Sequence, residues 1–529
     1  MGNSLKKAIL NPPVTFSQCF VNNEFDVARY FIYRRRKEES DDAMNMLTQI
    51  HLDIQVKKKR KLEDLNVETS KRTRLTYRTV KKHKILIRND DGTLRELQPI
   101  DTMWYHLYLK EPPRNKRVAL LFRRRFRLPY QNFLMLLHDI SNHPSFQVYM
   151  NRDCVGEGLT DISMLLLGAL RYLGRSWTFD DLEEATAISR ETNRLFFKKF
   201  IEYGSSNLFK RYVTDAAKSL SMNELTNLFM QAGFNGCIGS TDATHVPMLK
   251  CAAWAHNIHN GSKMHLPSRT YNVTVTHSRQ ILGSTIGHPG TFNDKTVIMF
   301  DRLLADIHNG KLKNEHRFTL LEKDEDNNIV ERNYVGAWFI VDNGYLNWSC
   351  TVPPMKHALS YKFIRFSDWL ESMRKDVECT FGIMKGRFTI LKTGIKLQNF
   401  ELTDQVWLTC CALHNMLLFA DGLDQGWEEG HLSYWEKEGL GIDELPGISF
   451  AETRLNRIYS EATGVNDESE LNESDNLFIE LATHNGKRYL NELPLRVFKK
   501  LLANHFDIRF RQKTINWPQR LRHKPLDNY

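Results

Sequence analysis

The stretch Ala337-Trp-Phe-Ile-Val-Asp342, followed by Asn343-Gly344, decides the fold expected for this chain. A short apolar run that stops at a turn is typical of a buried strand, and this one ends in a carboxylate. Upstream, Gly236-Cys-Ile-Gly-Ser-Thr-Asp242 repeats the pattern. Between the two, Thr270–Thr276 and Ile281–Ile286 indicate further strands, so strands in succession predict a meander.

Helices are expected around these strands. Asp294 begins one that runs through Ile307, and Ser367–Arg387 forms a long helix that carries Glu378. The order is three strands, helix, strand, helix, with Asp242 after the first strand and Asp342 after the fourth. This order predicts an α/β catalytic core, a ribonuclease-H-like mixed sheet flanked by helices.

The three carboxylates suggest a metal centre. Strand ends in an open sheet are places where side chains converge on a ligand, and converging carboxylates repel one another unless cations neutralise them. Hard oxygen ligands suit Mg²⁺ or Mn²⁺, and two such ions can clamp the attacking and leaving oxygens of a phosphodiester. The two aspartates also have simpler structural roles, since Asp242 and Asp342 can each stabilise a turn. Asp376 competes with Glu378 for the place at the site, because the two lie about 200° apart around the helix and cannot both face the same metal ions.

At this point the sequence resembles the DDE transposases of the PIF/Harbinger superfamily. The matching segments are Ser240-Thr-Asp-Ala-Thr-His-Val246, Gly287-His-Pro-Gly-Thr-Phe-Asn-Asp294, Val341-Asp-Asn-Gly-Tyr345, Arg374-Lys-Asp-Val-Glu-Cys-Thr-Phe-Gly-Ile-Met-Lys-Gly-Arg-Phe388 and Ala412-Leu-His-Asn415. The resemblance implies that the catalytic metal ligands are Asp242, Asp342 and Glu378, and 35 residues separate the last two, a spacing common in DDE enzymes. It also implies cutting at transposon ends, joining of the 3′ ends to target DNA, and help from a Myb-like DNA-binding partner.

Other residues near the motifs are candidates for supporting roles: His245, Asp294, Arg374, Lys385 and Arg387. Asp294 is most simply the N-cap of its helix. His245 either contacts a substrate phosphate or only holds the strand end. The basic residues either bind phosphate or form ion pairs with acidic neighbours on their helix.

The region before the sheet is expected to be helical. Ile162–Leu173 forms a compact apolar helix, Thr178-Phe-Asp-Asp181 has the form of a capped start, and Ser189 caps a following helix. This is a helix-turn-helix outline, whose last helix carries Arg190, Asn193, Arg194, Lys198 and Lys199 as candidate DNA contacts. A trihelical core without any role in DNA binding has the same outline.

Charge is unevenly distributed along the chain, whose net charge is +10. Residues 51–130 carry 22 Lys and Arg against 9 Asp and Glu, whereas residues 421–493 carry 5 against 17. The basic run Lys57, Lys58, Lys59, Arg60 and Lys61 predicts a nuclear import signal and a nuclear protein, with a solvated linker as the alternative. The excess of positive charge over residues 51–130 favours binding to a polyanion such as DNA over binding to a small phosphate ester.

Four regions are expected: a basic, partly disordered region (1–100), a helix-turn-helix region (115–230), a DDE nuclease domain (234–420), and an acidic then basic region (421–529). We expect a homo-oligomer and no membrane span. Cys251, His256, His259 and His265 match no standard zinc spacing and read as a polar loop.

The leading function is a metal-dependent transposase, and the alternative is a host-adopted, nuclease-inactive DNA- or chromatin-binding protein.

Overall fold

The computed structural model describes residues 86–515 except 90, 114, 151–160, 262, 265, 311–315, 356–359 and 423–470, and all of them belong to one compact unit. The expected nuclear signal at Lys57–Lys61 and most of the acidic stretch lie outside the described residues. Among the described helices, none has an apolar stretch that could cross a bilayer.

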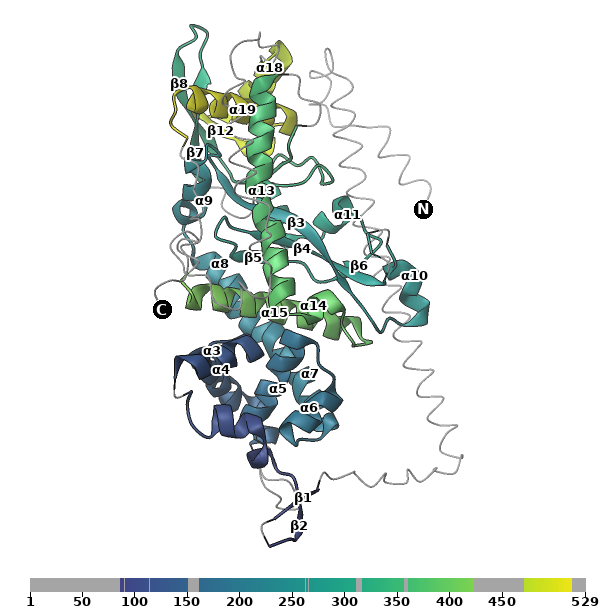
Figure 1. Cartoon of the computed structure of the whole chain (residues 1–529). Helices are drawn as coiled ribbons and strands as arrows, with labels where there is room; N and C mark the ends of the chain where they lie inside the picture. The colour runs from purple at the N-terminus through teal and green to yellow at the C-terminus, as the bar shows by residue number, and fades with distance from the viewer. Residues whose placement is uncertain are drawn as a thin grey trace. The chain divides into compact units, whose positions relative to one another are not determined.

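A mixed sheet forms the centre of the α/β core (Figure 1). Its strands are β3 (Cys237–Pro247), β4 (Ser268–Val275), β5 (Ile281–Ser284), β6 (His288–Pro289), β9 (Trp338–Ile340) and β10 (Thr351–Val352). The order is β10-β9-β3-β4-β5, with β6 also paired to β4. The meander β3-β4-β5 is antiparallel as expected, and β9 and β10 add parallel strands on the other side of β3.

One strand and one helix differ from the predicted boundaries. The strand expected to end at Asp242 continues to Pro247, because all residues from Ser240 to Pro247 pair with β4. The helix expected from Asp294 to Ile307 is two helices, α11 (Asp294–Ile298) and α12 (Arg302–His308). The break occurs because the Asp301 side chain accepts from the Leu304 N–H and starts α12 anew.

The long helix α13 (Tyr361–Arg387) packs along β3 and β4 and begins earlier than predicted. Short α14 (Ile390–Thr393) and α15 (Phe400–Ala420) follow it, and α9 (Met222–Gln231) leads into β3. Every residue of β4 is buried, as expected for a strand whose sheet is covered on both faces.

A second sheet joins two segments that are far apart in the sequence. The hairpin β7 (Arg317–Lys323) and β8 (Ile329–Val335) lies in the insert, and β12 (Lys487–Tyr489) from the C-terminal region pairs with β8 in parallel. β11 (Thr483–His484) pairs with β12, and α18 (Glu473–Leu481), η9 (Leu490–Glu492) and α19 (Leu495–Arg511) complete the unit. Since α19 packs on β7 and α13, part of the C-terminal region is built into the core (Figure 1).

The region before the core is helical, as predicted. Its elements are β1 (Leu86–Arg88), β2 (Leu94–Glu96), η2 (Pro99–Asp101), η3 (Tyr105–Leu109), α3 (Lys116–Phe126), α4 (Tyr130–Asn142), η4 (Pro144–Tyr149), α5 (Ile162–Arg175), α6 (Phe179–Thr186), α7 (Arg190–Tyr203), η5 (Gly204–Leu208), η6 (Lys210–Asp215) and α8 (Ala216–Ser219). Thr178 and Ser189 cap α6 and α7 as expected. Beside the central sheet lie η7 (Ala253–Ala255) and α10 (His256–His259).

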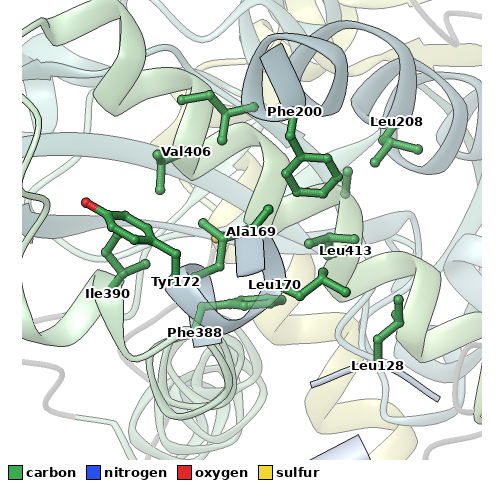
Figure 2. Close-up of a cluster of buried hydrophobic side chains, with 14 of the residues drawn as sticks. Leu128, Ala169, Leu170, Tyr172, Phe200, Leu208, Phe388, Ile390, Val406 and Leu413 are labelled. Carbon is green, nitrogen blue, oxygen red and sulfur yellow. The ribbon is translucent and has the colours of Figure 1, made fainter. Parts of the chain in front are cut away.

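One hydrophobic cluster extends from this helical region into the core. Figure 2 shows Leu170 of α5 and Phe200 of α7 in the same cluster as Phe388, Val406 and Leu413. All five side chains are at most 2% exposed. The expected boundary between the helix-turn-helix region and the nuclease domain is therefore bridged by a shared core, which holds the two firmly together.

Candidate active site

The register of two parallel strands brings Asp242 and Asp342 together. Ser240 of β3 is the partner of Ile340 of β9, and each aspartate lies two residues beyond its member of this pair. Asp242 lies within β3 and Asp342 follows the end of β9 by two residues, so the two aspartates occupy neighbouring positions along these paired strands. Asp342 then opens a tight turn, in which the Tyr345 N–H donates to the Asp342 carbonyl oxygen at 3.1 Å.

Glu378 joins Asp242 through a shared guanidinium. Arg374, one turn before Glu378 on α13, contacts Asp242 Oδ2 at 3.2 Å through Nη1 and Glu378 Oε1 at 2.7 Å through Nη2. Asp376 faces elsewhere: it is fully buried, and His277 Nδ1 lies 2.7 Å from its Oδ2. Of the two acidic residues that compete on this helix, the structure therefore places Glu378 beside Asp242.

Asp294 approaches from the other side of the turn. It is the first residue of α11 and Asn293 is the N-cap, so the expected capping role belongs to its neighbour. A Cβ on Gly344 would lie 3.0 Å from Asp294 Oδ2 and 3.6 Å from Asp342 Oδ2, so both carboxyl groups border the space above this glycine. Lys263 Nζ contacts Asp294 Oδ1 at 3.0 Å.

These groups make the site strongly acidic. Burial raises the pKa of Asp242 to about 6, and the charges of Asp294 and Glu378 add to the rise. Arg374 and a hydrogen bond from the Ala243 N–H, at 2.7 Å, act in the opposite direction. The rise is therefore due mainly to burial, and the two neighbouring carboxylates add a smaller electrostatic contribution that favours a cation.

A buried polar network, which no local sequence pattern predicts, supports the turn at Asp342. Tyr345 donates its hydroxyl to Asn272 Oδ1 at 2.7 Å, and the Asn272 amide donates to Asp301 Oδ2 at 2.6 Å. All three side chains are at most 4% exposed. Tyr345 lies in a motif quoted above, but only tertiary structure reveals that Asn272 of β4 is its partner.

Three of the predicted supporting residues have distinct environments. His245 is buried, its Nδ1 lies 3.1 Å from Thr270 Oγ1, and burial lowers its pKa to about 4, so it is neutral. Lys385 is half-buried on the same face of α13 as Arg374 and Glu378, and burial lowers its pKa. Arg387 is 2% exposed and donates to His414 Nδ1 at 3.2 Å, so its role is structural and the expected phosphate contact is wrong.

The carboxylate oxygens of Asp242, Asp342 and Glu378 are the type of ligand that a hard cation such as Mg²⁺ prefers. In the part of the chain that the structure describes, no three His, Cys, Asp or Glu side chains stand close enough to hold one metal ion. Arg374 explains this spacing, because its guanidinium stands between Asp242 and Glu378. In the predicted polar loop, His259 Nδ1 donates to the Ser268 carbonyl oxygen at 3.0 Å, and His265 lies outside the described residues.

Helix α7 presents less free positive charge than predicted. Arg190 pairs with Asp180 at 3.3 Å, Arg194 pairs with Glu191, and Lys199 Nζ donates to the Ser145 carbonyl oxygen at 3.1 Å. Lys198 is half-buried.

Asn193 does not face solvent. Its side chain is 3% exposed, and its amide donates to the Ile188 carbonyl oxygen at 2.9 Å. This contact fixes the turn before α7, so the expected DNA contact of Asn193 is wrong. A signal was present in the sequence: Asn193 lies on the same helical face as the apolar Phe196, Phe197 and Phe200.

Comparison with known proteins gives one family match. No curated protein and no solved structure matches the chain. Residues 210–424, which include Asp242, Asp342 and Glu378 and the whole central sheet, match the family model described as Plant transposon protein. The relation to transposases expected from the motifs is confirmed at this level, and the match supports a transposase-derived protein.

Proposed function

We propose that this chain is a metal-dependent DDE transposase of the PIF/Harbinger type, with a ribonuclease-H-like core. It would cut phosphodiester bonds at transposon ends and join the 3′ ends to target DNA. The observation that carries the proposal is the parallel register of β3 and β9, which sets Asp242 beside Asp342 while Arg374 links Asp242 to Glu378. The strand order β10-β9-β3-β4-β5 and the family match support it.

Asp242, Asp342 and Glu378 would hold Mg²⁺ or Mn²⁺ through their carboxylate oxygens. A pair of such ions activates the attacking water and stabilises the leaving oxygen. Arg374 contacts both Asp242 and Glu378 in this structure, and its guanidinium would become available to a phosphate oxygen if these carboxylates held a cation.

Further along the same face of α13, Lys385 can contact the next part of a DNA strand. A Cβ on Gly382, which lies between Glu378 and Lys385, would have no atom within 4 Å, so the space over this turn is open. The network of Tyr345, Asn272 and Asp301 would keep the Asp342 turn in place during the reaction.

The test compares wild type with Asp342→Asn, which keeps the size of the side chain but removes the charge. With Mg²⁺ and DNA that contains the ends of the element, cleavage seen on denaturing gels should fall by orders of magnitude, whereas DNA affinity should persist. Glu401→Gln, an exposed acid on α15, is the matched control and should cut normally. Mg²⁺ should raise the Tm of wild type but not that of Asp342→Asn.

A second candidate is a DNA- or chromatin-binding protein that no longer cuts. One observation favours it: Arg374 contacts both Asp242 and Glu378, so the chain itself supplies a cationic partner for these two carboxylates. If wild type binds the ends of its element but never cuts them, even with a Myb-like partner and with Mg²⁺ or Mn²⁺ present, this second function replaces the first.

The proposal extends to the cellular setting. We propose a nuclear protein that acts as a homo-oligomer on DNA together with a Myb-like partner. Alanine substitution of Lys57–Lys61 tests the nuclear part, as described below.

A further inference from the structure

An arginine cluster lies away from the acidic site, where the ends of α3 and α5 meet. Arg125 comes from the last turn of α3, and Arg171 and Arg175 lie one turn apart at the end of α5. Arg127 follows α3 and packs directly on α5: a Cβ on Gly174 would lie 2.6 Å from Arg127 Cγ. Only glycine at position 174 permits this close approach, which brings the two sets of arginines together.

Two of these guanidinium groups are held in place by neutral partners. Arg171 donates to the Arg125 carbonyl oxygen at 3.1 Å and lies over the Trp177 ring, 4.2 Å from its centre. Arg125 donates to the Tyr108 hydroxyl at 3.0 Å. Arg175 is exposed. Within the described ranges, none of Arg125, Arg171 and Arg175 forms an ion pair with a carboxylate, in contrast to the arginines of α7.

The positive charges in the cluster repel one another. Burial lowers the pKa of Arg171 to about 10, and the charges of Arg175 and Arg125 contribute. The pKa of Arg127 falls to about 10 for the same reasons, with Arg175 the first of its charged neighbours. The ends of two helices attract some positive charge, but this attraction does not require several arginines within range of one another. Arg125 and Arg175 repel Arg171, and none of these three has a carboxylate partner among the described residues, so the surface that they form is prepared for an anion.

We propose that Arg125, Arg171 and Arg175 form a phosphate-binding surface that holds the backbone of duplex DNA outside the active site. The inference rests on the proposed function only in its choice of DNA as the polyanion. Guanidinium groups bind phosphate oxygens in a bidentate manner, and the stacking of Arg171 on Trp177 reduces the freedom lost on binding. The surface assigns to α3 and α5 the backbone contacts expected of α7.

The experiment measures binding of the full chain to a fluorescent random-sequence duplex as a function of salt, without a cleavable end. Each phosphate contact contributes about 0.9 to the log–log slope. Replacing Arg125, Arg171 and Arg175 by Gln should therefore reduce the slope by about 2 to 3. The matched control replaces Arg317, Lys323 and Arg332 by Gln, three exposed charges on the β7–β8 hairpin, and should keep the wild-type slope.

A second variant guards against misfolding. Arg175→Gln removes one exposed guanidinium, so the slope should fall by about 0.9 while the Tm stays level or rises, because repulsion of Arg127 and Arg171 is relieved. A purely structural Arg175 would instead lower the Tm and leave the slope unchanged.

Three results would overturn the proposal: an unchanged slope in the triple variant, an equal loss in the hairpin control, or a loss confined to Arg190→Gln/Arg194→Gln/Lys198→Gln on α7. None of them bears on cleavage, which the Asp342→Asn comparison tests separately.

Discussion

Asp242→Asn should stabilise the protein while it abolishes cleavage. The carboxyl group of Asp242 has a pKa of about 6 in the folded chain against an ordinary value of 3.8, with burial as the largest cause, and its side chain is 21% exposed. The folded state therefore binds more protons than the unfolded state between these values, and stability falls as the pH rises through this window. At roughly 1.4 kcal/mol per pKa unit, the ionised carboxylate costs about 3 kcal/mol above pH 6.

Asparagine resembles the protonated acid and avoids this cost. Urea unfolding in EDTA at pH 7.5 should give Asp242→Asn a larger free energy of unfolding by up to about 3 kcal/mol, and the gain should vanish near pH 4. Asp326→Asn, on the exposed turn between β7 and β8, should change neither value. If Asp242→Asn is less stable than wild type at both pH values, Asp242 is a structural residue and its ionised carboxylate does not destabilise the fold.

Three further predictions concern the Asp342 turn and the basic run at Lys57–Lys61. Tyr345→Phe leaves the buried Asn272 oxygen without its 2.7 Å hydrogen bond, so urea unfolding should show a loss of about 1–3 kcal/mol, and wild-type stability would exclude the support network. Gly344→Ala places a methyl group 3.0 Å from Asp294 Oδ2, so the cleavage rate should fall while the Tm stays close to that of wild type. A large loss of Tm together with cleavage would indicate general damage to the fold. Alanine substitution of Lys57–Lys61 should move a fluorescent fusion from the nucleus to the cytoplasm, and unchanged nuclear accumulation would show that the run is no import signal.

Local patterns predicted the elements that depend on local chemistry. The Ser189 cap follows from a side chain that accepts a hydrogen bond within its own turn. The apolar runs before Asp242 and Asp342 predicted both strands, because burial on both faces requires continuous apolar sequence. The length of β3 was missed, because Ala243–Pro247 is polar in part and its strand conformation depends on pairing with β4.

Long-range pairings had no local signal. Nothing in Lys487–Tyr489 or in β8 indicates that the two pair, since their contact depends on the packing of α19 on β7. The Arg374 bridge is similar: helical spacing placed Arg374 near Glu378, but only the position of α13 over β3 shows that Asp242 shares the guanidinium. Helical spacing thus predicted the contact of Arg374 with Glu378, but not its contact with Asp242.

The pairing of β12 with β8 also has a consequence for how the protein is made. The nascent chain emerges from the ribosome with β8 well before Lys487, so during synthesis this strand has an open edge and the apolar surface of β7 that α19 covers lies exposed. The compact unit completes its folding only after Arg511 has been synthesised. A nonsense mutation anywhere upstream of Lys487 should therefore yield an aggregation-prone fragment rather than a shorter folded protein.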